Sequence, residues 1–162
     1  MNSRFSPYVF LAVLIATDGA AGQTQGMLRG LSEASVNVSH DWTEADERCG
    51  IRETDIKPIV SKALTDNALK VVDDSAFAEL LVTFTTLETE GTCVSQVRVA
   101  LRGWATATLL YDPRKEPKAT QVLLREESAM LLSPASQHGQ RFRDRVRALA
   151  ERLATAVRLD NQ

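Results

Sequence analysis

Three extended segments in the second half of the chain decide what kind of fold it can adopt. Residues 78–87, 94–111 and 120–132 are rich in Val, Leu, Thr and Phe, which favour β-strands. Residues 88–92 and 112–118 separate them and contain turn-forming Gly, Asp and Pro. Because consecutive strands joined by short turns pair side by side, these segments predict an antiparallel meander.

Two further strands are predicted ahead of this meander. Residues 33–40 alternate apolar and polar side chains, which indicates a strand with one buried face, and residues 69–72 form a short apolar run. Residues 41–53 are polar and lack periodicity, so we expect a loop there, anchored by Trp42 and Cys49.

A helix is predicted between these two strands. Its apolar residues recur at helical spacing and form one stripe. The stripe consists of Ile56, Ile59, Val60, Ala63 and Leu64. Asp55 is the expected N-cap, which places Pro58 in the first turn, where a missing N–H costs little, and Asn67 is the expected end.

A long helix is predicted at the end of the chain. Ser133 is the expected N-cap and Pro134 the first helical residue, with Gly139 delaying the regular start. The apolar stripe consists of Phe142, Val146, Leu149, Leu153 and Val157. Arginines border it, with Arg141, Arg145 and Arg152 on one flank and Arg143, Arg147 and Arg158 on the other. A membrane-surface helix has a similar pattern, but with no Trp on the stripe, packing against a core is favoured.

Together these elements predict an α+β fold with the order β-α-β-β-β-β-α. A single-layer antiparallel or mixed sheet of four to five strands would have two helices on one face. We find no repeat or linker, so residues 23–162 are predicted to form one domain.

Residues 1–22 have the pattern of a signal peptide. Arg4 precedes an apolar run, residues 8–16, and small residues follow up to Gly22. A run of this length is too short to cross a bilayer as a helix, which needs roughly 20 residues. We therefore expect cleavage after Ala21 or Gly22, a periplasmic or secreted location, and no stable membrane insertion.

The two cysteines are expected to form a disulfide. Exported proteins meet an oxidising compartment, so Cys49 and Cys93 are predicted to join, with two buried free thiols as the alternative. Closing a loop of about 45 residues would stabilise the fold by roughly 4 kcal/mol in the chain-entropy description.

Charge and composition exclude some classes of function. The net charge of −2 lacks the basic footprint of a general nucleic-acid binder, so no nucleic-acid partner is expected. Charge is nevertheless uneven, because residues 41–55 are acidic and residues 137–159 are rich in arginine. The acids of residues 41–55 lack the pattern of a calcium loop, and two cysteines with two distant histidines do not form a zinc site, so neither metal nor cofactor is expected.

No catalytic constellation is evident. Ser39, His40 and Asp41 are consecutive in a strand and point to alternating faces, so they cannot form a hydrolase triad. His40 is interpreted as a strand-end residue and His138 as a polar residue of a helical first turn. Glu126 and Glu127 are adjacent in a strand and face apart.

Two features depart from a plain core. Alternation along residues 94–110 places Trp104 among Arg98 and Arg102 on the polar face, which is the composition of a binding hot spot. The alternative is a β-bulge at Gly103, which would reverse the alternation and bury Trp104.

The second feature is a set of adjacent leucine pairs in strands. They are Leu80-Leu81, Leu109-Leu110, Leu123-Leu124 and Leu131-Leu132. Neighbours on a strand face opposite ways, so both faces of the sheet carry leucine, whereas two helices can cover only one. The uncovered face could meet a partner, another copy or the loop at 41–53, or the pairs could mark strand ends where alternation lapses.

The leading hypothesis is an exported, non-catalytic protein that binds another macromolecule or itself in the cell envelope. Candidate partner-binding residues are Arg98, Arg102 and Trp104. The alternative is a small-molecule or lipid-binding domain that uses the space between sheet and helices, and a hydrolase is the third hypothesis.

Overall fold

A computed structural model describes residues 28–75, 77–108 and 116–162 of the chain. The predicted signal peptide and the Leu109-Leu110 pair lie outside these residues. The described residues form the elements β1 (Glu33–Val38), α1 (Glu44–Arg48), α2 (Glu53–Asp66), β2 (Lys70–Val72), β3 (Ala78–Thr89), β4 (Thr92–Thr108), β5 (Pro117–Pro134) and α3 (Ala135–Asp160). None of the helices within the described ranges is long and apolar enough to span a membrane.

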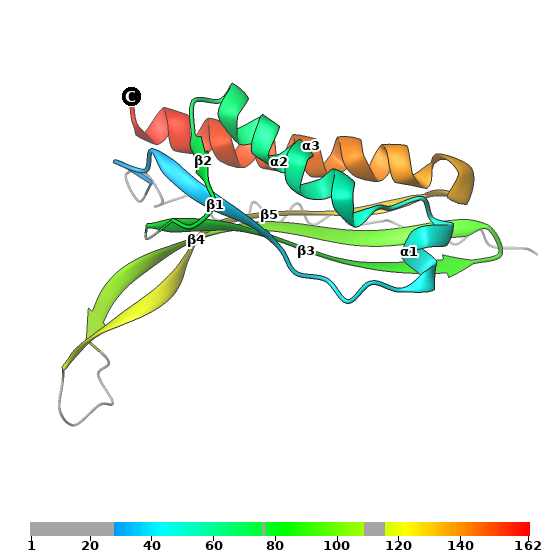
Figure 1. Ribbon diagram of the computed structural model, residues 1–162, viewed down its shortest axis with the longest axis horizontal. Helices are drawn as coiled ribbons and strands as arrows, with labels where there is room; N and C mark the ends of the chain where they lie inside the picture. Colours follow the sequence, from blue (N-terminus) through cyan, green and yellow to red (C-terminus); the bar gives the residue numbers. More distant parts are fainter. Residues whose placement is uncertain (1–27, 76, 109–115) are drawn as a thin grey trace, which may run out of the picture.

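The strands form one mixed sheet in the order β2-β1-β3-β4-β5 (Figure 1). Strand β1 runs parallel to both β2 and β3, and β3, β4 and β5 form an antiparallel meander. The predicted α+β class and element order are confirmed. The parallel pairs arise because the chain passes through α1 and α2 before it returns as β2, and such crossovers bring strands back in the same direction.

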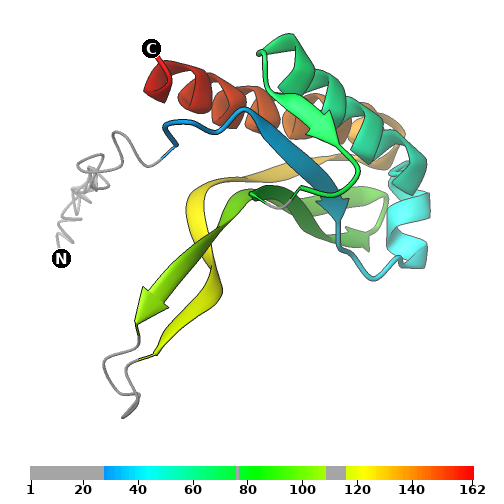
Figure 2. The ribbon, with the colours of Figure 1, turned by 60° about the vertical axis from the view of Figure 1, so that its left-hand side comes forward.

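Helices α2 and α3 lie side by side over one face of the sheet (Figures 1 and 2). The inward residues of both helices are buried and meet the apolar side chains of β1, β3 and β4. All five apolar-stripe residues predicted for the last helix are buried. This layer of side chains between sheet and helices is the hydrophobic core of the protein.

The predicted loop at 41–53 contains the short helix α1, which corrects the sequence interpretation. The Oδ2 atom of Asp46 accepts hydrogen bonds from the backbone N–H and the hydroxyl of Thr43, both at 2.8 Å. These bonds join the residue before the helix to its third residue, as in a capping box. A local polar interaction of this kind forms a helical turn without apolar periodicity.

Helix α2 begins three residues earlier than predicted. It starts at Glu53 with Arg52 as its N-cap, so Asp55 lies inside the first turn and Pro58 inside the helix. Asp55 forms an ion pair with Arg143 of α3 at 3.2 Å, which gives its carboxylate a partner in another element. The predicted end at Asn67 is confirmed.

Helix α3 is regular from Ala135 onward, so Gly139 does not delay it. Gly139 instead permits a close approach to the backbone of Gly50, because a Cβ atom at position 139 would lie 2.1 Å from the Gly50 carbonyl oxygen. Gly50 itself has a φ of +70°, a conformation that L-residues rarely adopt. The two glycines thus dock the start of α3 on the turn after α1.

The far ends of β4 and β5 project away from the sheet as an arm (Figures 1 and 2). At its base the pairing register shifts between Leu101 and Arg102, and Leu124 of β5 is the extra residue. A bulge of this kind bends the strands and increases their twist. It therefore marks the point where the arm departs from the helix-covered sheet.

Candidate binding surface

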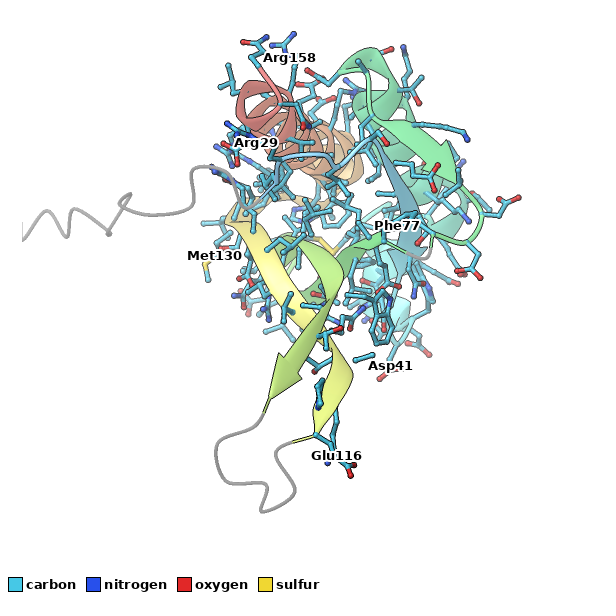
Figure 3. The ribbon with its side chains drawn as sticks, turned by 90° about the vertical axis from the view of Figure 1, so that its left-hand side faces the viewer. Arg29, Asp41, Phe77, Glu116, Met130 and Arg158 are labelled. Atoms are coloured by element: carbon cyan, nitrogen blue, oxygen red, sulfur yellow. A yellow bond between two sulfur atoms is a disulfide. The ribbon has the colours of Figure 1, made fainter. Side chains whose placement is uncertain are left out.

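The sheet face turned away from the helices, called the open face below, exposes apolar side chains. Along β4, Val97, Val99 and Leu101 are buried toward the helices, whereas Arg98 and Trp104 lie on the open face. Six large apolar residues of the meander and its immediate flank are exposed, namely Phe77 (69%), Leu87 (65%), Trp104 (57%), Leu123 (50%), Met130 (71%) and Leu132 (64%). Figure 3 labels Phe77, next to the central strand β3, and Met130, on the edge strand β5.

Phe77, Trp104 and Leu123 form the arm cluster, at the base of the projecting arm. The N–H of Trp104 donates a hydrogen bond to the carbonyl oxygen of Phe77 at 3.2 Å. Leu123 is opposite Arg102 in the register of β4 and β5, and Gln121 is opposite Trp104. Three strand segments therefore contribute an aromatic or aliphatic side chain to one exposed patch.

The position of the bulge explains why Trp104 is exposed. The extra residue lies in β5, at Leu124, and not at Gly103, so the alternation of β4 continues through Trp104. The sequence left open whether Trp104 is exposed or buried, and in the structure it is exposed. Gly103 has a different role, since a Cβ atom there would lie 2.8 Å from Cδ1 of Leu124, so its bare backbone admits the bulged leucine.

The three predicted site residues share the open face. Arg98 forms an ion pair with Glu126 of β5, and its side chain remains 48% exposed. Arg102 is half-buried, and within the described ranges it forms no ion pair. Trp104 therefore has two arginines on its own strand, namely Arg98, which is ion-paired, and Arg102, which lies opposite Glu79 of β3 without forming an ion pair in the described part of the chain. Their predicted role in partner binding stays a prediction.

Leu87, Met130 and Leu132 form a second patch, the hairpin-end cluster, at the opposite end of the open face. Leu87 is opposite Val94, which is opposite Leu132, so a continuous apolar row crosses three strands. Met130 lies beside this row, opposite Gln96. The two clusters are separated by polar rows that include the ion pair of Arg98 and Glu126.

The leucine pairs divide between the two faces of the sheet as predicted. Their inward members are Leu80, Leu124 and Leu131, which pack in or against the core, and their outward members are Leu81, Leu123 and Leu132. Leu81 is 8% exposed, whereas Leu123 and Leu132 are at least half exposed. The outward leucines of β5 therefore belong to the two exposed clusters.

A buried polar network lies at the end of the core near α1. Asp46 is fully buried and, besides Thr43, bonds His40 Nε2 through Oδ2 at 2.8 Å. Burial alone would raise the pKa of Asp46, but hydrogen bonds from His40 and Thr43 outweigh it and lower that pKa. The ring of His40 stacks on Phe84 at a centroid distance of 3.8 Å. His40, two residues beyond the end of β1, is thus part of a packed cluster, which the sequence interpretation as a strand-end residue did not include.

His138 is the centre of a second buried set of polar groups. Its Nε2 bonds the Ser95 hydroxyl and its Nδ1 bonds the Ser133 hydroxyl, both at 2.8 Å. Ser95 in turn bonds Thr86 at 2.9 Å. Burial lowers the pKa of His138, which favours the neutral ring. The sequence interpretation of His138 as simply a polar residue of the first helical turn is therefore incomplete.

Of these polar groups, Asp46, Ser95 and His138 are closed to solvent, whereas Thr43 is exposed and His40 is half-buried. Ser95 and His138 have no exposed surface, so a substrate cannot reach the hydroxyl beside the imidazole. The consecutive residues Ser39, His40 and Asp41 do not form a triad either, because His40 bonds Asp46. Within the described residues, no group of three or more His, Cys, Asp or Glu side chains is placed to hold a metal ion.

The disulfide joins Cys49 and Cys93 as predicted, with their Cα atoms 6.0 Å apart. Both cysteines are fully buried. Cys49 is the C-cap of α1, and Cys93 lies at the start of β4 opposite Ser133. The bond therefore fastens α1 to the sheet beside the buried polar network.

The space between sheet and helices is filled by the side chains of the core. An open groove of about 740 Å³ lies outside it, between α3 and β5, and its lining includes Leu28, Glu127, Ala148, Arg152 and Leu159. Arg152 and Glu127 form an ion pair across this groove at 3.2 Å. The groove is thus charged as well as apolar, and it lies at the margin of the interlayer space that the alternative ligand-binding hypothesis would use.

Polar residues at inward strand positions are the sequence signal for the buried network. Thr86 follows three inward apolar residues of β3, and Ser95 precedes the inward Val97 of β4, so both are polar at core positions. Thr43 and Asp46 have the spacing of a capping box. Polar residues at inward positions require buried partners, and which partners they find depends on tertiary contacts.

The fold and the surface together define a class, an α+β domain with one face of its mixed sheet covered by helices and the other face uncovered and partly apolar. A minor lipoprotein from Acinetobacter baumannii has a similar backbone, with a TM-score of 0.46 and 12% identity over 82% of this chain and 94% of that one. A dodecameric PelC variant from Paraburkholderia phytofirmans has a TM-score of 0.43 and 10% identity over 80% of this chain and 88% of that one. No protein-family model and no curated protein sequence matches the chain. These similarities are too distant to transfer an activity or a residue role.

Proposed function

We propose that this chain is an exported protein that binds another protein in the cell envelope through the open face of its sheet. The supporting observation is the gathering of exposed apolar side chains into two clusters on one face. Contiguous apolar surface is rare on monomeric proteins and marks interaction sites. Binding would remove these side chains from water, and this transfer would supply the main favourable term.

The arm cluster is the proposed centre of this surface. Trp104 is a large, rigid side chain with few rotatable bonds, so its immobilisation costs little entropy. Arg102 lies on the same face, opposite Glu79 of β3, and forms no ion pair in the described part of the chain. Tryptophan and arginine are the residue types enriched at binding hot spots. A partner that fits would present an apolar pocket beside a carboxylate.

Photocrosslinking tests this function directly. Trp104 is replaced by p-benzoylphenylalanine, and the matched control places the same crosslinker at Lys57, an exposed residue of α2. We expect discrete adducts from position 104 in cells that produce the protein, and no such adducts from position 57. Equal crosslinking at both positions, or none at position 104, would contradict the proposal. An adduct with a second copy of this chain would show that the surface binds another copy and not a different protein.

The exported location rests on two supports. Residues 1–22 have the pattern of a cleavable signal, and Cys49 and Cys93 form a disulfide, a bond typical of oxidising compartments. N-terminal sequencing of the protein from the producing cell tests it. We expect the mature chain to start at Gly22 or Gln23, and retention of Met1 would contradict export.

A further inference from the structure

Within the described residues, strand β5 has no strand partner along one side of its backbone. It is the last strand of the sheet and pairs only with β4 among the described strands. In an antiparallel edge strand, every second residue directs its N–H and C=O outward. The opposite edge is β2, which has three residues, whereas β5 has eighteen. Short edge strands discourage pairing with other chains, and β5 lacks that protection.

One stretch of this edge is open to pairing. Residues 128–133 (Ser-Ala-Met-Leu-Leu-Ser) contain no charge and no proline, and they equal a typical strand in length. The charged residues 125–127 precede them and Pro134 follows. Charges and prolines are the usual devices that block edge pairing, and here they bound the stretch without interrupting it.

The two sides of this stretch differ in chemistry. On the open face, Met130 and Leu132 are exposed, and labelled Met130 projects at the rim in Figure 3. On the helix face, one flank of α3 lies next to β5. Arg152 of this flank bonds Glu127 of β5, and Ala148 lines the groove between α3 and β5.

Two further arginines lie on the same flank of α3. Arg141 and Arg145 precede Ala148 and Arg152 at spacings of seven residues each, which places them on the same side of a helix. Both are exposed, and neither forms an ion pair within the described ranges. The other flank differs, because Arg143 is paired with Asp55 and Arg147 with Asp144. In the first half of α3, the arginines without an ion pair therefore lie on the side that borders the free edge.

We propose that residues 128–133 of β5 accept an extended segment of a partner polypeptide, whose alternate side chains are acidic and apolar. The segment would add a sixth strand to the sheet by backbone hydrogen bonds. Its acidic side chains would face Arg141 and Arg145, and its apolar side chains would lie beside Met130 and Leu132. This inference rests on the proposed function and names the chemistry of the partner.

The same geometry disfavours a second copy of this chain as the occupant. A two-fold pairing of residues 128–133 with themselves would place both α3 helices on the same side of the joined sheet. The flanks with Arg141 and Arg145 would then face each other, and like charges across an interface oppose association. An acidic strand has the complementary charge, so charge selects the heterologous partner.

The test uses a fluorescent peptide of about eight residues in which valine and glutamate alternate, the length of an ordinary strand. Its binding to the full-length mature protein is measured by anisotropy at low and high salt. A valine-lysine peptide is the charge control. Two further peptides carry N-methyl groups either on all valines or on all glutamates, and each blocks one edge of the strand. We expect binding of the valine-glutamate peptide that weakens with salt, no binding of the lysine peptide, and loss of binding for only one of the two methylated peptides.

Matched variants of α3 locate the site. Arg141→Gln with Arg145→Gln should weaken binding of the valine-glutamate peptide by about tenfold, the equivalent of two exposed ion pairs. Arg143→Gln with Arg147→Gln removes the same charge from the opposite flank and should leave binding nearly unchanged. Because all four side chains are exposed or half-buried, both variants should fold.

Several outcomes would overturn the inference. In the peptide assay they are no binding of the valine-glutamate peptide, equally strong binding of the valine-lysine peptide, or equal weakening by the two double variants. A dimer in sedimentation that depends on β5 would make a second copy the occupant, and binding of phosphatidylglycerol vesicles through Arg141 and Arg145, without peptide binding, would make a membrane the partner. If the peptide does not bind but position 104 still gives crosslinks, the strand-addition proposal is wrong and the proposed function is still supported. If those crosslinks fail while the peptide binds, the edge is the binding site and the arm cluster is not.

Discussion

At the scale of single residues, the buried polar groups are the least expected feature of this protein. His138 has hydroxyl partners on both ring nitrogens. Oδ2 of Asp46 bonds Thr43, the residue before α1, and His40, whereas the buried Oδ1 of Asp46 has no hydrogen-bond partner among the described residues. A buried polar group without partners would cost more than its bonds contribute, so the network favours the arrangement that forms these bonds. It consequently specifies how α1, the hairpin end of the sheet and the start of α3 fit together.

Acidification should destabilise the protein through His138. Its ordinary pKa is 6.5, and burial lowers the pKa in the folded state, so the unfolded chain binds the proton first as pH falls. The stabilisation from the neutral ring is complete above about pH 6.5 and is lost as pH falls from there toward the lowered pKa. We expect a lower urea midpoint at about pH 5.5 than at about pH 7.5. His138→Gln should reduce this difference, and an unchanged pH dependence in the variant would contradict the assignment.

Gly139→Ala should destabilise the protein, although alanine is the better helix former. Alanine in place of glycine normally stabilises a helix interior by about 1 kcal/mol. At position 139, however, the new methyl group would overlap the Gly50 carbonyl oxygen. We expect a net loss of roughly 1 to 3 kcal/mol in urea unfolding. Ser136→Ala, an exposed position in the same turn, is the control and should change stability by less than about 0.5 kcal/mol.

At the scale of elements, α3 has two functions that its sequence pattern combines. Its apolar stripe closes the core, as predicted, and its two arginine flanks have different surroundings. On one flank, which faces α2, Arg143 pairs with Asp55 and Arg147 with Asp144. The other flank borders β5, where Arg152 pairs with Glu127 and Arg141 and Arg145 form no ion pair within the described residues. The sequence alone presents the flanks as equivalent, because the residues that neutralise one of them include Asp55, far away along the chain.

Truncation of the α3 stripe tests its role in the core. Leu149 and Leu153 have no exposed surface, so Leu149→Ala or Leu153→Ala should cost about 2 to 5 kcal/mol through lost burial and a cavity. Arg143→Gln with Arg147→Gln should cost less than about 1 kcal/mol, because partly exposed ion pairs contribute little. Urea unfolding measures both. A Leu149→Ala protein with an unchanged midpoint and weakened liposome binding would show instead that α3 is a membrane-surface helix.

At the scale of the whole molecule, the disulfide and the two-faced sheet determine the architecture. Cys49 and Cys93 connect α1 to β4 across a sequence separation of 44 residues. The helices cover one face of the sheet and leave the open face to water or a partner (Figure 2). The arm extends the open face beyond the helix-covered core. The exposed side chains at its base, such as Trp104, therefore lie where the β4–β5 hairpin bends.

Loss of the disulfide should lower global stability. Cys93→Ser should reduce the free energy of unfolding by roughly 2 to 5 kcal/mol, the range for small exported domains. The measurement is urea unfolding without reductant, with the wild-type protein in reductant as the matched control. Reduced wild-type protein and the variant should unfold at similar midpoints. A variant as stable as the oxidised protein would contradict a stabilising role for this bond.

The sequence predicts four features of the fold correctly. They are the element order, the antiparallel meander, the apolar stripe of α3 and the disulfide between the two cysteines. Each depends on a local pattern, either a period along the chain or a residue type that has one chemistry in an exported protein. The helix in residues 44–48 and the start of α2 at Glu53 were mispredicted. Both helix starts depend on which hydrogen-bond or ion-pair partners side chains such as Asp46 and Asp55 find. Several residues close together in the sequence could cap each helix with similar stabilisation, so the sequence does not decide between them.

The sequence by itself determined which residues of β4 share a face, because alternation along a strand is a property of the backbone. Whether Trp104 would be exposed depended on the bulge, and only the pairing of β4 with β5 placed the extra residue at Leu124. Likewise, the arginine flanks of α3 follow from helical periodicity, but only packing against α2 and β5 gave Arg143 and Arg152 acidic partners and left Arg141 and Arg145 without one among the described residues. Periodicity is local and additive, whereas partners across the core are chosen by the simultaneous fit of distant segments, which only the tertiary structure decides.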